Sequence, residues 1–203
     1  MKLLLITDAW MPQVNGVVTT LVELVRELSK LGHQVTVIHP SLFKTRPCPG
    51  YAGIDLAIRP KKQLRTLFAA NQFDAVHIAT EGPLGWSALQ AAKKLKLPVS
   101  SDFRTNFHAY SDHYGIGWLR GAIMNYMRKF HNAALATMVP TPVLAHELAA
   151  VGFERLHVVP RGVDTDLFNP VRRSPALRAQ WGASDETLVL LCVGRLAAEK
   201  NLS

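Results

Sequence analysis

A chain of 203 residues can hold one large α/β domain, or one domain and part of another. Its composition, 48% apolar and 19% charged without low-complexity tracts, is that of a globular protein and excludes a disordered one. No run approaches the roughly 18 uncharged apolar residues that cross a bilayer. The net charge of +8 indicates an anionic partner, which composition leaves open among nucleic acid, a phosphorylated substrate and a membrane surface.

The alternation of strand-like and helix-like segments begins at the first residues. MKLLLIT is followed at once by Asp8, so a β-strand over 3–8 is expected and a secretion signal is not. A helix over 17–31 follows, with apolar residues at the i, i+3, i+4, i+7 spacing of one helical face. Gly32 ends this helix, and a strand over 34–40 completes a βαβ unit.

The same alternation continues through the middle of the chain. Further strands are expected at 54–58, 74–80, 98–103, 135–141 and 155–160. Further helices are expected at 63–71, 83–95, 118–134 and 142–151. Nearly continuous apolar strands joined by helices indicate a parallel sheet. The predicted fold class is α/β, a Rossmann-like, doubly wound, mostly parallel sheet with helices on both faces, which binds ligands at the carboxyl ends of its strands.

Three regions are predicted along the chain. Residues 1–165 form an N-terminal Rossmann-like domain, and residues 166–186, which are polar and contain two prolines, form an interdomain linker. Residues 187–203 contain an apolar strand over 187–196 and the start of a helix, interpreted as the first elements of a truncated second domain. This tail is expected to pack irregularly on the N-terminal domain or to pair with another chain.

The turn between the first strand and the first helix, WMPQVNGVV, is the first candidate site. Gly16 stands at the start of the helix, where unpaired backbone N–H groups and the positive end of the helix dipole favour an anion. Asn15 beside it is a candidate acceptor-binding residue. The alternative is that Asn15 and Gly16 form only a turn before a helix. The GxGxxG dinucleotide fingerprint is absent.

Two more turns follow strands that end at the same sheet edge. The segment from Asp102 to His108 gathers Asp, Arg, Asn and His, and Arg104 is its candidate acceptor contact, although an ordinary polar loop is the alternative. Glu81 is a candidate acceptor contact after the strand that ends at Thr80. For Thr80, a cap on the following helix is the favoured interpretation.

The last motif is GRLAAEKNL at 194–202. It begins where an apolar strand ends, and Arg195 and Lys200 are spaced so that both can reach a phosphate near the helix start. A basic helix start by itself is a weak indication of a phosphate site. Its place after a linker and an apolar strand makes the indication more specific.

These motifs together resemble the retaining glycosyltransferase family 4. VGRLAAEKNL is similar to the first strand and turn of the family's C-terminal domain, and further motifs agree upstream in this order: PQVNGVV, LGHQVTVI, FDAVHIATEGPLG, TNFHAYSDHYG, VPTP and PRGVDTDLFNP. The nearest branch resembles GDP-mannose-dependent α-mannosyltransferases and the sulfoquinovosyl- and digalactosyl-lipid synthases. The resemblance implies the GT-B fold, with two facing Rossmann-like domains, the donor in the cleft and no required metal or other cofactor.

The resemblance also implies roles for single residues. Gly16 lets backbone N–H groups approach the donor phosphate, and Arg195 and Lys200 neutralise the diphosphate, which gains charge as the glycosidic bond breaks. His108, the candidate catalytic residue, matches the position beside the reacting sugar and donates a hydrogen bond there. The N-terminal domain mostly binds the acceptor. The family's paired glutamates, E-x7-E, are expected beyond residue 203, so the chain should be inactive alone.

The expected function is transfer of a hexose, with mannose from GDP-mannose as the suggested case, to a lipid or saccharide acceptor. The alternative is a non-catalytic sugar- or nucleotide-binding module with the same sheet. Nucleic acid is not an expected partner, because interleaved aromatic residues and known binding motifs are missing. The two cysteines show no metal-ligand spacing, which favours a cytoplasmic location.

Attachment to the inner face of an anionic membrane is an additional hypothesis. The segment 118–130 combines aromatic and apolar residues with three cations at helical spacing, which suits a helix lying on such a membrane. An ordinary helix with its apolar stripe on the sheet is the favoured alternative, because every surface helix of this fold needs such a stripe. Lys61, Lys62 and Arg65 form a second basic cluster.

Overall fold

The computed structural model describes residues 1–48, 54–104 and 120–193. It contains two compact units, Met1–Pro160 and Arg161–Ser203, each of which is described by itself. His108, Arg195 and Lys200 lie outside the described residues. The division of the chain into an N-terminal domain, a linker and a truncated second domain therefore stays a prediction.

The first unit is built on a six-stranded sheet in which all neighbouring strands are parallel. In spatial order the strands are β2 (Gln34–Ile38), β1 (Lys2–Ile6), β5 (Ala75–Ile78), β6 (Val99–Asp102), β7 (Ala136–Val139) and β8 (Leu156–Val158). The chain leaves β1 in one direction to form β2 and later returns to the other side of β1 to form β5. Ligands of such sheets bind at this switch point, at the carboxyl ends of the strands.

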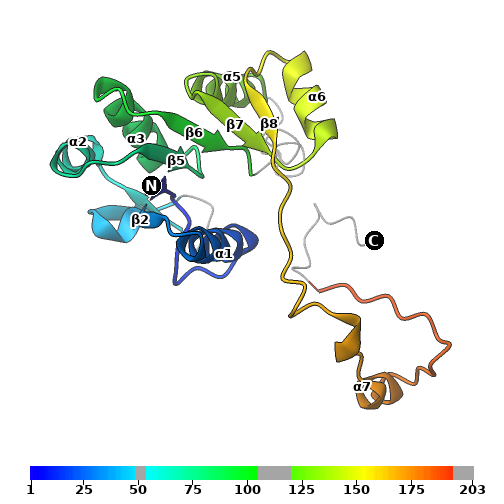
Figure 1. Ribbon diagram of the computed structural model, residues 1–203. Coiled ribbons are helices and arrows are strands. Elements are labelled where there is room, and N and C mark those ends of the chain that lie inside the picture. Colours follow the sequence, from blue (N-terminus) through cyan, green and yellow to red (C-terminus); the bar gives the residue numbers. More distant parts are fainter. Residues whose placement is uncertain (49–53, 105–119, 194–203) are drawn as a thin grey trace. The chain divides into compact units, whose positions relative to one another are not determined.

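Helices cover the sheet on both faces (Figure 1). They are α1 (Gly16–Lys30), α2 (Lys61–Ala70), α3 (Pro83–Lys94), α5 (Arg120–His131) and α6 (Pro142–Ala150). Because successive strand residues point to opposite faces, Leu4 and Ile6 pack with α2, α3 and α5, whereas Leu5 packs with Leu21 of α1. The predicted α/β class is confirmed, and each of these helices and sheet strands lies close to its predicted range.

A small antiparallel pair, β3 (Thr45–Pro47) and β4 (Asp55–Ala57), forms a separate two-stranded sheet, and a short 3-10 helix η1 (Pro40–Leu42) precedes it. The strand expected at 54–58 exists, but its partner β3 was not predicted. Three residues that end in a proline carry no strand pattern of their own. Pairing with β4 is what makes them a strand.

The burial of side chains on helix α5 distinguishes a helix that lies on a membrane from one that packs on the sheet. Met127 and Phe130 are only 3% and 1% exposed, and they pack in the cores beneath the helix. The favoured interpretation, an ordinary helix with its apolar stripe on the sheet, is therefore confirmed. Among the described residues, no helix has the length and apolar character needed to cross a membrane.

The second unit contains a 3-10 helix η3 (Pro170–Arg172) and a short helix α7 (Pro175–Gln180). The strand predicted over 187–196 is not formed in its described part, 187–193. Leu188, Leu190 and Val193 are more than 80% exposed there. The reason is physical: an apolar run becomes a strand only when a neighbour takes its backbone hydrogen bonds, and the described residues give it none.

Candidate functional site

The switch point brings the turn after β1 against the turn after β5. The Thr80 hydroxyl donates a hydrogen bond to Oδ2 of Asp8 at 2.9 Å and accepts one from the Asp8 backbone N–H at 2.7 Å. The backbone N–H of Leu84 donates to Oδ1 of Asp8 at 3.3 Å. The carboxylate of Asp8 thus occupies the N-terminus of α3, where unpaired N–H groups and the helix dipole favour negative charge.

The prediction that Thr80 caps α3 is wrong. The N-cap residue is Gly82, which makes no side-chain cap, and the carboxylate of Asp8 arrives from the end of β1 instead. A Cβ atom on Gly82 would overlap that carboxylate, so the close approach requires glycine. Asp8 is a functional candidate that sequence reasoning missed. The available signal was an acidic residue placed directly after a buried first strand.

Burial raises the pKa of the Asp8 carboxyl to about 6, from an ordinary value of 3.8. Hydrogen bonds from Thr80 and from the backbone of Leu84 and Gly85 oppose this shift, and the nearby Glu81 carboxylate adds to it. The pKa of Asp8 is higher in the folded protein than in the unfolded chain. Its contribution to the free energy of unfolding is therefore fully present below pH 3.8 and is lost as the pH rises through about 6.

Asp8→Asn should remove this pH dependence, because an amide keeps the Oδ1 acceptor and does not ionise. Between pH 3.8 and pH 7, the unfolding free energy of the variant should rise relative to wild type by about 3 kcal/mol, which corresponds to the shift of the pKa. Urea unfolding of both proteins across this range measures the difference. A difference between them that does not vary with pH would contradict the role given to Asp8.

Glu81, the next residue after Thr80, turns its side chain into the protein. Its Oε1 lies 3.1 Å from Nε2 of His131, and its backbone oxygen accepts the Tyr126 hydroxyl at 2.5 Å. Nδ1 of His131 lies 2.9 Å from Oγ of Ser101, which in turn lies 3.0 Å from Oγ1 of Thr137. These contacts join the β5–α3 turn to α5, β6 and β7.

The Glu81–His131–Ser101 chain has the residue types of a hydrolase triad, but a substrate has no access to it. His131 and Ser101 are 0% exposed and Glu81 is 7% exposed. The His131 ring also packs against Phe103 and Phe130. The network therefore holds the turn in place, and it directs the Glu81 carboxylate away from the surface where an acceptor contact was predicted.

Arg104 is also turned toward the protein. Its Nη2 lies 2.5 Å from Oδ2 of Asp102, and the two side chains are only 6% and 16% exposed. Nε2 of His77 lies 3.8 Å from the same carboxylate oxygen, and Nδ1 of His77 lies 2.9 Å from Oγ of Ser100. The predicted acceptor contact Arg104 is therefore engaged with the end of β6, as part of a polar row on the α1 side of the sheet.

The start of α1 differs from the start of α3. Oδ1 of Asn15 accepts the backbone N–H groups of Val17 and Val18 at 3.0 Å each, so this predicted acceptor contact serves as the N-cap. A Cβ atom on Gly16 would meet no atom within 4 Å, and its φ is not positive. Neither packing nor backbone conformation within the described residues requires glycine at this position.

The two helix starts lie at the same sheet edge. Val17 of α1 and Ala79 at the end of β5 share one apolar cluster. The α3 start is filled by the carboxylate of Asp8, whereas α1 has a neutral cap and no acidic residue in its first turn. An anion would therefore meet a carboxylate at the start of α3 but only the neutral amide cap of Asn15 at the start of α1.

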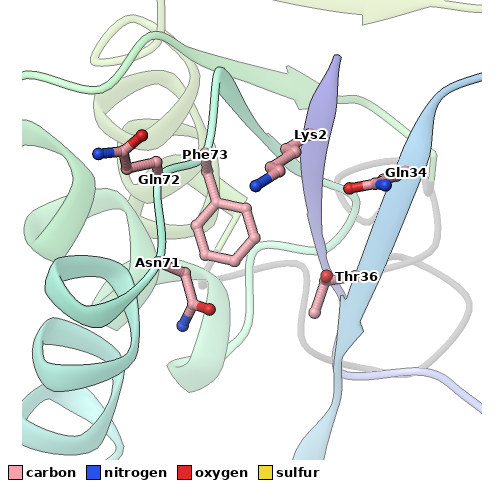
Figure 2. Close-up of a pocket in the computed structure, with 6 residues that line it drawn as sticks. All are labelled: Lys2, Gln34, Thr36, Asn71, Gln72 and Phe73. Carbon is pink, nitrogen blue, oxygen red and sulfur yellow. The ribbon is translucent and has the colours of Figure 1, made fainter.

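We also searched for a pocket and for a metal site elsewhere among the described residues. A small hollow of about 170 Å³ lies at the opposite sheet edge, between the start of β1, the edge strand β2 and the turn after α2 (Figure 2). It is lined by Lys2, Gln34, Thr36, Asn71, Gln72 and Phe73. In the described part of the chain, no group of three or more His, Cys, Asp or Glu side chains is placed to hold a metal ion.

Solved structures share this architecture. Anabaena HepE, in complex with UDP-glucose, matches with a TM-score of 0.53 and 18% identity, over 90% of this chain and 50% of its own. The UDP-GlcNAc 2-epimerase of Methanocaldococcus jannaschii matches with a TM-score of 0.51 and 16% identity, over 79% and 46%. Identities this low show the fold alone. The class defined by the sheet and its switch point is the Rossmann-like domain of the GT-B fold.

The family follows from the sequence itself. The model of Glycosyltransferase Family 4 matches residues 14–167, and the chain belongs to this family.

Among curated relatives, a GDP-mannose-dependent alpha-mannosyltransferase of Mycobacterium tuberculosis is 29% identical, over 99% of this chain and 57% of its own length. The sulfoquinovosyl transferase of Arabidopsis thaliana is 27% identical over 93% and 40%. The alpha-monoglucosyldiacylglycerol synthase of Acholeplasma laidlawii is 28% identical over 100% and 57%. The chain spans about half the length of these relatives. Their names match the branch that the motifs predicted.

Proposed function

We propose that this protein is a retaining hexosyltransferase that moves a sugar from a nucleotide-sugar donor to a lipid or saccharide hydroxyl. Membership of glycosyltransferase family 4 supports the reaction class. The names of the relatives support a mannosyl or glycolipid product. In a retaining transfer the acceptor attacks the face from which the diphosphate leaves, so the site must stabilise that diphosphate while both groups are close together.

One observation carries the proposal: the start of α1 at the switch point has a neutral cap, Asn15, and no carboxylate. Gly16 lies there without any internal need for glycine, and no acidic side chain lies in the first turn. Backbone N–H groups at such a helix end suit a phosphate, and a missing side chain allows it to approach closely. Because Asp8 already occupies the start of α3, the phosphate is assigned to α1.

The remaining roles are extensions of the family resemblance. Arg195 and Lys200 neutralise the leaving diphosphate, and His108 donates a hydrogen bond to the reacting sugar or the leaving group. GDP-mannose is the proposed donor, supported by three mannosyltransferase relatives. No metal is assigned to the reaction, because the cations and the helix start supply the positive charge.

Replacing Gly16 with alanine tests the proposal directly. Because the new methyl group meets no atom of the chain, the unfolding free energy of the 203-residue protein should stay the same or rise by up to about 1 kcal/mol. In a protein extended to the length of the curated relatives, kcat/KM for the donor should fall on the order of a hundredfold, because the methyl group displaces the phosphate.

The readout is release of nucleoside diphosphate in the presence of acceptor, screened over GDP- and UDP-sugars. Unchanged kcat/KM with an intact fold would refute the phosphate site. The alternative function, a non-catalytic sugar- or nucleotide-binding module, predicts donor binding without any release of diphosphate. The same screen therefore separates the two functions.

The proposed location is the cytoplasmic face of a membrane, as a peripheral protein. Two relatives are named as synthases of monoglucosyldiacylglycerol, and the diacylglycerol part of that product resides in a bilayer. Helix α5 is not assigned to the contact, because its apolar stripe is buried.

A further inference from the structure

The hollow at the amino ends of β1 and β2 is a pocket that the proposed reaction does not use (Figure 2). Lys2 and Gln34 are register partners in the parallel pair of β1 and β2, so their side chains share one face of the sheet, and Thr36 lies on that face too. Further along the same face, Leu4 and Ile38 are buried in the core with α2, whereas Gln34 and Thr36 are exposed. The hollow is therefore the uncovered end of a face that is otherwise packed.

The polar side chains of the hollow are rich in groups that both donate and accept hydrogen bonds. Gln34, Asn71 and Gln72 are carboxamides, and Thr36 carries a hydroxyl group. Within residues 1–48, 54–104 and 120–193, the side chains of Gln34, Thr36 and Gln72 make no hydrogen bond. Nδ2 of Asn71 donates to the backbone oxygen of Leu67 at 2.9 Å, which leaves Oδ1 of Asn71 as an acceptor. A ligand with several hydroxyl groups would find partners of both kinds here.

Phe73 supplies the apolar part of the hollow. Its ring is half-buried and packs edge to face on Phe68 of α2, with ring centroids 6.4 Å apart and an interplanar angle of 74°. Figure 2 shows the ring at the centre of the hollow, with Lys2 and Gln34 on the strand side and Asn71 on the helix side. The face of an aromatic ring is negative and attracts the weakly positive C–H groups of a sugar ring. One aromatic ring among a few polar groups is a common lining of a small-molecule site.

The size and the charge of the hollow restrict the ligand further. Its volume of about 170 Å³ is below the roughly 300–1,000 Å³ of pockets that enclose a whole ligand, so it suits one sugar unit of a longer saccharide. Lys2 is the only charged residue of the lining, and its ammonium group makes no ion pair within the described residues. The Asp74 carboxylate accepts the backbone N–H of Lys2 instead, at 2.6 Å. An ammonium group in this position favours a ligand that carries an acidic group.

We propose that this hollow binds one acidic sugar unit, a uronic acid residue, of a saccharide chain. The Lys2 ammonium pairs with the carboxylate of the sugar, the carboxamides and Thr36 bind its hydroxyl groups, and Phe73 lies against its C–H face. The five residues of β1 span about 17 Å between this edge of the sheet and the switch point. The unit bound here is therefore not the one that reacts, and its binding needs no donor and no transfer.

The test is an NMR titration of the 203-residue chain with methyl glucuronide and with methyl glucoside, which differ only in the carboxylate of the former. The readout is the set of side-chain amide signals of Gln34, Asn71 and Gln72. Both sugars should shift these signals, and the dissociation constant should be about tenfold lower for the glucuronide, because a hydrogen bond to a charged group is the stronger one. Acetate, a carboxylate without a sugar ring, serves as the control ligand.

Three single variants separate the contributions. Lys2→Gln should remove the preference for the glucuronide and leave binding of the glucoside unchanged. Gln34→Thr should weaken binding of both sugars about fivefold, because one amide partner is lost. Lys44→Gln removes an exposed cation outside the hollow and should change neither constant. Lys2 and Gln34 are exposed, so the rest of the spectrum should show an intact fold in each variant.

Several results would overturn the proposal. Unshifted amide signals with both sugars would rule out the hollow as a sugar site. Equal affinities for the two sugars would rule out the acidic unit, and acetate binding as tightly as the glucuronide would rule out the sugar. A failed donor screen in the longer protein would instead refute the glycosyl transfer and leave sugar binding at the hollow intact.

Discussion

His131→Leu should lower the free energy of unfolding by about 4 kcal/mol, one of the two largest effects expected in this protein. The leucine removes Nε2 from the Glu81 carboxylate, which is only 7% exposed and so loses its hydrogen-bond partner in a buried position. Ser101 keeps its contact with Thr137, so the main loss falls on Glu81. Urea unfolding followed by circular dichroism measures the change.

The double variant Glu81→Leu, His131→Leu is the matched control. If the loss comes from an unpaired buried carboxylate, removing that carboxylate should restore a large part of the stability, because replacing both partners by apolar groups leaves nothing unpaired. Additive losses in the double variant would show that packing of the His131 ring against Phe103 and Phe130 dominates instead.

Gly85→Ala should destabilise the protein by about 3 kcal/mol or more. A Cβ atom there would overlap the backbone oxygen of Thr80 and would lie 3.1 Å from Cγ2 of Ile78. Thr80 cannot easily move away, because its hydroxyl is bonded to Asp8. The clash must therefore push α3 away from the sheet and weaken the cap that Asp8 makes at its N-terminus.

Gly121→Ala provides the control with the opposite sign. Gly121 also lies in the first turn of a helix, but a Cβ atom there meets no atom within 4 Å. Alanine should stabilise α5 by up to about 1 kcal/mol, because glycine is the poorer helix former. Unfolding in urea compares the two variants directly. A Gly85→Ala protein as stable as Gly121→Ala would contradict the tight packing of α3 on the β5–α3 turn.

Local patterns in the sequence were enough for the main elements. The 3.6-residue period of α1, the apolar run of β1 and Pro83 at the start of α3 each act within a few neighbouring residues. The family motifs are local in the same sense, because each follows a strand or opens a helix. Gly16 was found for this reason, and the structure adds that nothing within the described chain explains a glycine there.

What tertiary structure alone decided is which polar groups meet. Asp8 caps a helix that begins at Pro83, and Glu81 pairs with His131. No local period links residues so far apart, and each of these side chains fits a surface site as well as a buried one when only the sequence is considered. Their positions follow from strand order, because β1 and β5 become neighbours only when the sheet forms. The sequence by itself therefore determined the family and the elements. The parallel pairing of β1 with β5 decided that the Asp8 carboxylate caps α3, so that α1 keeps only the neutral cap of Asn15.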